Sequence, residues 1–460
     1  MKRISLFILI LPLIQFGQTN LSNQSLELIE KSIQKSNILK NARSDLSIDS
    51  IETKGIKQNY IPTLTMNGFY AYGAGNFNVD VPTFDLPISG IEIFDGESEF
   101  NAKGHVFNTN LTAKMLLFGG MQVNYGSKAS NEKIKAKNYM LETEKAKLIK
   151  DMIDTFDKIE LLEASKKVLE NSEIRLQKEK QKAMVAVRSG LITPYDREKI
   201  SAAELKLESK KTEVEGNLEL LYLKLSIMTD VSTESIREYD FKLNPWVLES
   251  VDANFTNRAE LKALRASIDA YNYKLKMNKS TFLPKVEAFA TLTYFNLFDT
   301  RVETPYDTPI TEQPIDLDLN HFTLFPAYFL GVGFQWDLFK GLKNSNQTKI
   351  TSIQKSMAET KKIEAEEQLE LFEKKVQIDF SVKSKQLVLK QKEKEVASNA
   401  LNLAIKSYEQ GLIDISERLE AEVNYQEAAL AYYMSIARQR QSALDVLSAK
   451  GSLDINHINN

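Results

Sequence analysis

The sequence KGLKNSNQTKITSIQKSMAETKKIEAEEQLELFEKK (residues 340–375) opens the stretch that decides the fold. From Lys340 to Lys450 the chain contains no proline and only two glycines, Gly341 and Gly411. Because proline and glycine are the residues that most often interrupt helices, we predict two long helices that fold back on each other at Gly411.

Apolar residues recur along both predicted helices in steps of three, four and seven, which is the spacing of a coiled-coil seam. They are Ile350, Ile353, Met357, Leu369, Phe372, Val376, Phe380 and Leu387 on the first helix, and Leu412, Ile415, Leu419 and Val423 on the second. At ~1.5 Å per residue, a helix from Gly341 to Tyr408 would be roughly 100 Å long. This length exceeds an ordinary globular domain, so we predict a projecting hairpin.

The first residues, MKRISLFILILPLIQFGQTN (1–20), have the pattern of a cleaved secretory signal. Lys2 and Arg3 precede an apolar run at residues 4–14. A membrane anchor is the alternative, but the run is about half of the ~20 residues that a spanning helix needs. We therefore expect a signal peptide within residues 1–18.

The composition excludes several classes of function. The chain has no cysteine, which rules out disulfides, thiolate metal sites and cysteine nucleophiles. Its 59 basic residues nearly balance 62 acidic ones, and this balance gives no reason to expect nucleic acid as a partner. After the signal, no apolar segment is long enough for a transmembrane helix, so any membrane crossing would consist of strands.

The two halves of the chain are copies of each other. KQNYIPTLTMNGFYAY (57–72) resembles KSTFLPKVEAFATLTY (279–294), and further landmarks keep an offset of 221 or 222 residues. The matched landmarks are Pro62 with Pro284, Phe118 with Phe339, Gly120 with Gly341, and Gly190 with Gly411. A register held over such a span indicates an internal duplication.

Each copy is predicted to contain a helix, a strand, a long loop, a strand, a long helix, a turn and a returning helix. The predicted parts are a first repeat at 19–228 with a strand pair in 62–118 and a hairpin tip near 190, a linker at 229–256, a second repeat at 257–450 with a strand pair in 284–339 and a tip near 411, and a tail at 451–460. The fold class is thus α+β and mainly helical.

The predicted strands alternate between apolar and polar residues. In 106–118 and 330–338 one face is apolar and the other is polar or small, over about 10 residues, which suits a tilted strand across an outer membrane. A half-buried sheet in a soluble protein would alternate in the same way. Long acidic loops are expected at 73–106 and 296–327.

Strand number favours the membrane interpretation. Four strands cannot close into a spanning barrel, and open strand edges cannot face lipid. Three chains would supply twelve strands, so we expect a homotrimer with a shared β-barrel in contact with outer membrane lipid and a helical barrel that continues below it.

These landmarks resemble the TolC-like outer membrane efflux proteins. The resemblance covers essentially the whole mature chain and includes the strand ends MLLFGG (115–120) and WDLFKG (336–341) and the hairpin tip SYEQGLIDISERLEAEVNYQEAALAYY (407–433). It implies a trimer with a twelve-stranded barrel and a periplasmic helical tunnel. It also implies a periplasmic adaptor protein and an inner-membrane pump as partners.

The resemblance assigns roles to residues at the tunnel tip. Tyr408 matches a tyrosine that helps to latch the closed aperture by bonding to the neighbouring hairpin, and Asp196 matches its acidic partner. An arginine that often joins the latch is absent, because Ile413 occupies its position. The alternatives are that Tyr408 is a seam residue and that Asp196 is an acid favoured at a helix start.

Two further groups at the tips are candidates. Glu417 and Glu420 match pore-facing aspartates of the family and would form two acidic rings in a trimer, although a glutamate pair on a helix is usually solvated surface. Apolar residues at the turns would dock the adaptor, or would instead pack across the turn. The docking candidates are Gly190, Leu191, Ile192, Gly411, Leu412 and Ile413.

The leading prediction is a passive exit duct of a tripartite efflux or type I secretion system, with no cofactor. The alternative is a periplasmic adaptor or coiled-coil scaffold. The sequence contains no phosphate-binding glycine loop, no GxSxG and no HExxH, so we do not expect an enzyme.

Overall fold

The computed structural model describes residues 21–82, 84–85, 92–93, 96–188, 193–248, 257–307, 312–451 and 453. The predicted signal peptide lies outside these residues. The chain divides into two compact units. The helical unit comprises Met1–Asp49, Glu132–Asp269 and Ser356–Asn460, and the sheet unit comprises Ser50–Asn131 and Ala270–Lys355. Each unit takes segments from both sequence repeats, so the repeats are not separate domains.

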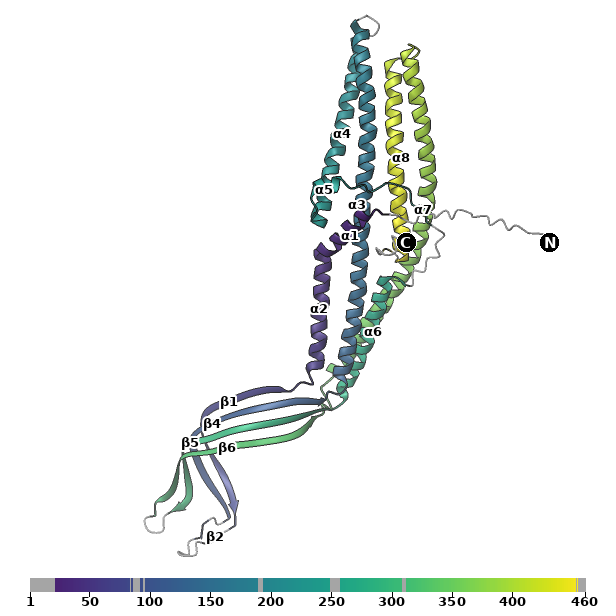
Figure 1. The fold of residues 1–460 in the computed structure, drawn as a ribbon. Helices are drawn as coiled ribbons and strands as arrows, with labels where there is room; N and C mark the ends of the chain where they lie inside the picture. The colour runs from purple at the N-terminus through teal and green to yellow at the C-terminus, as the bar shows by residue number, and fades with distance from the viewer. Residues whose placement is uncertain are drawn as a thin grey trace, which may run out of the picture. The chain divides into compact units, whose positions relative to one another are not determined.

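The order of elements confirms a mainly helical fold with four long antiparallel strands (Figure 1). The elements are α1 (Asn23–Lys35), α2 (Asn37–Gln58), β1 (Thr63–Val81), β2 (Phe84–Asp85), β3 (Glu92–Ile93), β4 (Gly96–Phe118), α3 (Gln122–Arg188), α4 (Pro194–Thr229), α5 (Thr233–Arg237), α6 (Ala259–Lys279), a 3₁₀ turn (Ser280–Phe282), β5 (Lys285–Asp307), β6 (Pro314–Gln335), α7 (Lys343–Glu409) and α8 (Ile415–Lys450). The duplication is visible in the helix lengths: α3 and α7 have 67 residues each, and α4 and α8 have 36 each.

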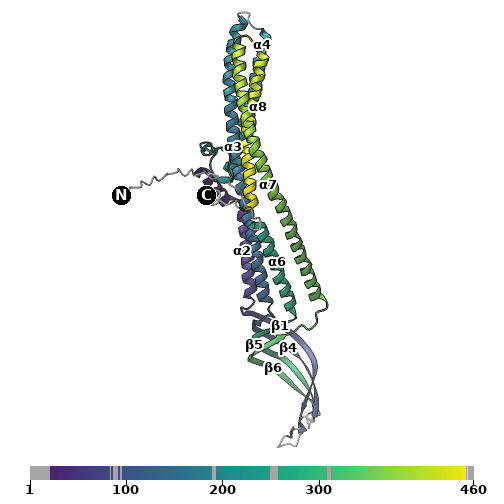
Figure 2. The same ribbon diagram turned by 90° about the vertical axis from the view of Figure 1, so that its right-hand side faces the viewer.

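Within the helical unit, the hairpin of α3 and α4 lies beside the hairpin of α7 and α8 (Figures 1 and 2). The main core forms around the side chains of α3, with contributions from α1, α4 and α8. Smaller apolar clusters continue along the hairpins, for example Leu169, Leu176 and Leu207 with Leu419 against them. A narrow seam of this kind holds helices together without a wide core.

The segment between the repeats packs onto the helices of its own unit. Phe241 and Trp246 are buried in the main core. The backbone N–H of Trp246 donates to Oε1 of Gln439 at 3.0 Å, and Nε2 of Gln439 donates back to the carbonyl of Trp246 at 2.7 Å. This reciprocal pair satisfies the backbone of an irregular segment where it crosses α8. Part of the predicted linker, residues 249–256, lies outside the described residues.

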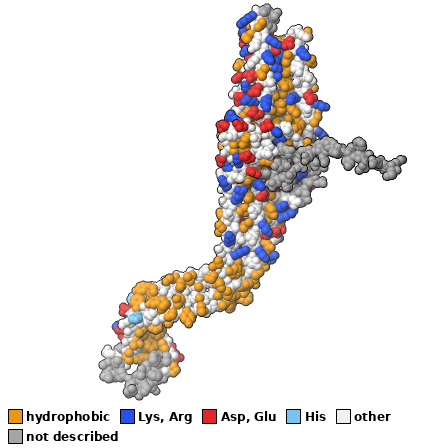
Figure 3. Space-filling model, in the orientation of Figure 1, with side chains coloured by type: hydrophobic (Ala, Val, Ile, Leu, Met, Phe, Trp, Pro, Cys, Tyr) orange, Lys and Arg blue, Asp and Glu red, His pale blue; other side chains and the backbone are white. Residues whose placement is uncertain are grey.

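The sheet unit contains one open four-stranded sheet in the order β1-β4-β5-β6, antiparallel throughout. One face, here called the apolar face, carries exposed hydrophobic side chains such as Leu64, Met66, Tyr70, Leu330 and Phe334. Hydrophobic side chains dominate the view of the sheet in Figure 3. In the described part of the chain, no helix is long and apolar enough to cross a membrane.

The opposite face of the sheet, here called the polar face, carries the alternate side chains. Asn67 pairs with Asn110, and Thr65 with Thr112, across β1 and β4. On this face Gly331 lies opposite Phe289. A Cβ atom at Gly331 would come within 2.8 Å of the Phe289 ring, so glycine is required for the ring to lie across β6.

The strands are about twice as long as predicted, because they have 19 to 23 residues instead of about 10. The expected loops at 73–106 and 296–327 are therefore wrong in extent. Strand pairing continues through Tyr72 to Val81 on β1 and through Phe298 to Asp307 on β5. The acidic residues misled the prediction: many of them are strand residues that pair with polar partners, as Glu99 does with Asn76 at 2.7 Å.

Candidate functional site

The turn of the second hairpin is formed by Gly411 in a left-handed conformation, with φ of 72°. The N–H of Gly411 donates to the carbonyl of Tyr408 at 3.0 Å, and the N–H of Leu412 donates to that of Ser407 at 2.8 Å. These bonds close the last turn of α7. Leu412 is 72 % exposed, and Ile413 is half-buried. The first turn, with Gly190, Leu191 and Ile192, lies outside the described residues.

Asp196 is the third residue of α4 and completes a capping box with Thr193. Its Oδ2 accepts hydrogen bonds from the backbone N–H of Thr193 at 3.2 Å and from the Thr193 hydroxyl at 2.7 Å. These hydrogen bonds lower the pKa of Asp196, and the Lys199 ammonium lowers it further. The carboxylate is thus ionised and held at the start of α4, with remaining acceptor capacity for another donor.

Tyr408 lies half-buried near the tip and packs against Ala183, Ile200 and Ile415. Burial raises the pKa of its phenol, and the negative charges of Glu179 and Asp196 raise it further. In the described part of this single chain, no hydrogen bond joins Tyr408 to Asp196. Tyr408 is therefore both a seam residue and close enough to Asp196 to feel its charge. The predicted latch between neighbouring hairpins stays a prediction.

Glu417 and Glu420 lie near the start of α8, and both side chains are exposed. Asp414 caps this helix by accepting from the backbone N–H of Glu417 at 3.0 Å. Spaced by three, the two glutamates occupy one exposed side of the helix. The structure thus leaves both carboxylates available to face a lumen.

Sequence reasoning missed a buried ion cluster between the hairpins, formed by Arg175 of α3 with Arg418 and Glu422 of α8. The side chains of Arg418 and Glu422 are 0 % and 2 % exposed, and Nη1 of Arg418 donates to Oε2 of Glu422 at 3.0 Å. Arg175 donates to Oε1 of the same carboxylate at 2.7 Å. Burial alone would raise the pKa of Glu422, but these guanidinium groups outweigh it and lower the pKa.

The signal for this cluster was the spacing of Arg418 and Glu422, four residues apart on a predicted helix. The spacing alone does not identify a buried pair, because exposed glutamates nearby on the same helix have similar spacings. Among the described residues, the cluster has two unusual features. Nε and Nη2 of Arg418 are both buried without a hydrogen-bond partner. Buried polar groups of this kind, without a hydrogen-bond partner, cost free energy.

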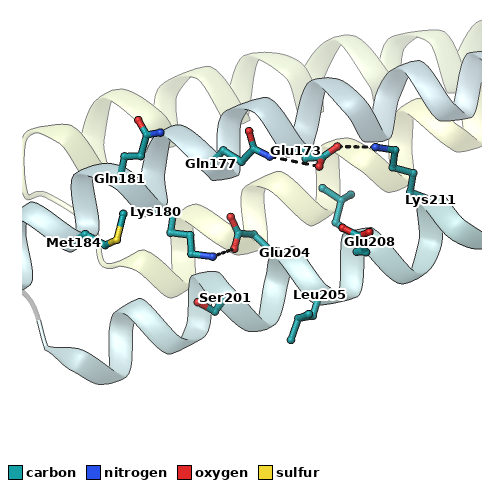
Figure 4. Close-up of a pocket in the computed structure, with 11 residues that line it drawn as sticks. Glu173, Gln177, Lys180, Gln181, Met184, Ser201, Glu204, Leu205, Glu208 and Lys211 are labelled. Carbon is teal, nitrogen blue, oxygen red and sulfur yellow. Dashed lines mark hydrogen bonds and ion pairs between the residues drawn. The ribbon is translucent and has the colours of Figure 1, made fainter.

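A hollow of about 600 Å³ lies between α3 and α4 in the first hairpin (Figure 4). Four of its charged lining residues are paired across the hairpin: Lys180 contacts Glu204 at 2.6 Å, and Lys211 contacts Glu173 at 3.0 Å. Among the described residues there is also no cluster of His, Asp or Glu that could hold a metal ion. This hollow is a space within a charged seam, without a group poised for catalysis.

Solved structures of outer-membrane channels share this fold. The Campylobacter jejuni CmeC channel matches with a TM-score of 0.70 at 14 % identity, covering 93 % of this chain and 86 % of that one. VceC from Vibrio cholerae matches with a TM-score of 0.67 at 15 % identity, covering 93 % and 96 %. The Neisseria gonorrhoeae MtrE channel, in its open state, matches with a TM-score of 0.64 at 14 % identity, covering 94 % and 89 %. The architecture is therefore that of a TolC-like outer-membrane channel.

The sequence profile of the outer membrane efflux protein family matches residues 254–452, which include the second repeat. This stretch of the chain is similar to that family. No curated protein sequence matches it. The match to the family model and the shared fold agree with the predictions of an outer-membrane efflux channel with a periplasmic helical extension. The alternative of a periplasmic adaptor or scaffold is therefore dropped.

Proposed function

We propose that three copies of this chain form the outer-membrane exit duct of a tripartite efflux or type I secretion system. The open sheet carries this proposal. Its outer strands, β1 and β6, have no partner along their outer edges among the described residues. Unpaired backbone groups cannot face lipid, and four strands are too few to close on themselves. The edge strands must therefore pair with other chains.

The directions of the edge strands allow three copies related by rotation to close into a ring. Neighbouring strands in the order β1-β4-β5-β6 are antiparallel, so β1 and β6 run in opposite directions. The β6 edge of one copy can thus pair with the β1 edge of the next and continue the antiparallel pattern. Repeating this head-to-tail contact three times gives a closed twelve-stranded ring. The apolar face would meet lipid, and the polar face would line the lumen.

A seam on α7 supports the same assembly within the helical unit. Hydrophobic residues spaced by seven or four follow this helix and are exposed in the single chain: Leu371, Ile378, Val382, Leu389, Val396 and Leu403. A regular apolar seam of this kind is the surface of a coiled coil. Its partner would be a hairpin of the neighbouring copy.

The tips would supply the gate and the docking surface. Glu417 and Glu420 would form acidic rings that concentrate cations at the narrow end. Tyr408 would donate its phenolic proton to Asp196 across hairpins, and Asp196 is ionised and has acceptor capacity for it. The turns, with Gly190, Leu191, Ile192, Gly411, Leu412 and Ile413, would meet a periplasmic adaptor. An inner-membrane pump would drive transport, because the sequence contains no phosphate-binding glycine loop through which the duct could use a nucleotide.

The test is the native mass of the protein extracted in mild detergent from separated outer membranes. We expect a trimer. Introducing glutamates at Leu389 and Val396 together should abolish it, because the seam would then carry buried like charges. Lys392→Glu, on an exposed side chain of the same helix, is the matched control and should remain trimeric. A monomer in the wild-type outer-membrane extract would refute the shared barrel.

A further inference from the structure

A second hollow, of about 490 Å³, lies in the sheet unit where the strands adjoin α2, α3 and α6. Here it is called the strand-base hollow. Its size is that of pockets that hold small organic molecules. Part of its wall is apolar, formed by Ile56, Leu116, Val123 and Met277. Gly126 of α3 also lines it, and a Cβ atom there would already come within 3.3 Å of the Met277 sulfur.

The charged lining of the hollow consists of Lys114, Lys285 and Glu287. The strand register places them together: Lys114 lies opposite Phe289, and Glu287 and Lys285 precede Phe289 by two and four residues on the same face. All three therefore belong to the polar face. The hollow has one net positive charge, from two lysines and one glutamate.

Lys114 and Lys285 supply the two cations of the hollow. Their ammonium groups form no ion pair with any described carboxylate, whereas Lys103 on the apolar face contacts Glu303 at 2.7 Å. Lys285 is partly buried, so water solvates its charge incompletely. Asp337, two residues after β6, interacts electrostatically with Lys285 without a direct ion pair. Cations beside an apolar wall that have no directly bound carboxylate favour an anion that also has an apolar body.

We propose that the strand-base hollow binds organic anions with an apolar body as they pass through the duct. This inference rests on the proposed function, because the hollow opens toward the polar face that would line the lumen. Three such sites would surround the pore in a trimer. The duct would then contribute to cargo preference, and this preference would be opposite in sign to that of the acidic rings at the hairpin tips.

Single-channel recording of the purified trimer in planar bilayers tests the proposal, with 2-naphthalenesulfonate as the probe. We expect concentration-dependent block by this anion and much weaker block by the neutral 2-naphthalenemethanol. Lys114→Gln with Lys285→Gln should raise the half-blocking concentration at least tenfold, since two charge-assisted contacts are lost. Glu287→Gln should lower it, because a repelling carboxylate is removed.

Lys279→Gln is the matched control, because Lys279 is an exposed lysine of the same unit that does not line the hollow. It should leave the block unchanged. The opposite signs expected for the lysine and glutamate variants exclude general damage as the cause. Equal block by the neutral compound, or an unaltered block in the double lysine variant, would overturn the inference while leaving the duct intact.

Absence of any conductance would instead count against the proposed duct. Equilibrium dialysis of 2-naphthalenesulfonate against the protein in a non-ionic detergent would then decide the hollow separately. Binding that is weakened at least tenfold by the double lysine variant would support the site. Binding that is unchanged in the double lysine variant, or no binding, would overturn the proposed site.

Discussion

Arg418 and Glu422 lie one turn apart on α8 and form a salt bridge of 3.0 Å that is almost fully hidden from solvent. Arg175 of α3 shares the same carboxylate, so the cluster ties one hairpin to the other. Two cations and one anion in a buried place are costly to desolvate. We therefore expect the cluster to determine how the two hairpins align, and to add little net stability.

Removing the carboxylate should strongly destabilise the helical unit. Glu422→Gln leaves two guanidinium groups without their shared anion, and breaking a buried pair in this way costs about 3–5 kcal/mol. We expect a large drop in the thermal unfolding temperature of the detergent-solubilised protein. Replacing Arg418 with Met and Glu422 with Leu together should recover much of the loss. A single variant as stable as the wild type would show that the cluster is hydrated in solution.

The Glu422 carboxylate should also make the stability of the protein depend on pH. Because the pKa of Glu422 is lowered on folding, its contribution to stability is present above its unfolded pKa of about 4.3 and is lost as the pH falls through the folded value. The wild type should thus lose stability below about pH 4 more steeply than the doubly apolar variant. Parallel acid-melting curves for the two proteins would contradict this assignment.

Asp154 of α3 should show the opposite pH dependence. Burial raises the pKa of Asp154 to about 6. The charges of Asp157 and Asp445 add to this rise, and those of Lys150 and Lys158 oppose it. The folded state therefore binds more protons than the unfolded state between about pH 4 and 6, and stability falls as the pH rises through this window.

Asp154→Asn should therefore stabilise the protein above pH 6, on the order of 1 kcal/mol once solvent screening is allowed for. The gain should be much smaller near pH 4, where the folded carboxyl is neutral and the unfolded one is only about half ionised. Thermal melts at pH 4 and pH 8 measure the difference. Asp45→Asn, at an exposed position of α2, is the control and should have no effect at either pH.

Replacing Glu417 and Glu420 together with alanine should reduce the cation preference of the pore. Their exposed carboxylates would act as rings in the trimer, and neutral rings no longer favour cations over anions. The reversal potential under a salt gradient should move toward zero. Glu427→Ala, further along α8, provides a comparison. Reversal potentials that do not change would remove the ring assignment.

Leu412→Asp should abolish export without disturbing the trimer. Leu412 is among the most exposed hydrophobic residues of the chain and lies at the turn, so a charge there would oppose apolar contact with an adaptor but should not affect packing within the chain. Drug susceptibility of cells that depend on this channel measures export, and native mass checks assembly. Full export by the variant would place docking elsewhere.

The duplication, the long hairpins and the four-strand plan followed from sequence because each leaves a periodic signal. Strand length did not, since acidic residues such as Glu97 and Glu99 suggest a loop. Only the folded structure shows that the side chains of Asn78 and Asn76 donate hydrogen bonds to them. The buried cluster was also hidden. Sequence spacing shows that Arg418 and Glu422 can form a pair. The contact of Glu422 with Arg175, which is 247 residues away in the sequence, depends on how the hairpins pack.

The unpaired edges of β1 and β6 have a genetic consequence. When closure requires that every copy offers both edges, a subunit with one damaged edge still binds its neighbour through the other and leaves a gap in the ring. With equal amounts of normal and damaged chains mixing at random, only about one ring in eight would contain normal chains alone. Alleles that alter a single edge strand should therefore be dominant over the wild-type allele, whereas alleles that prevent synthesis should be recessive.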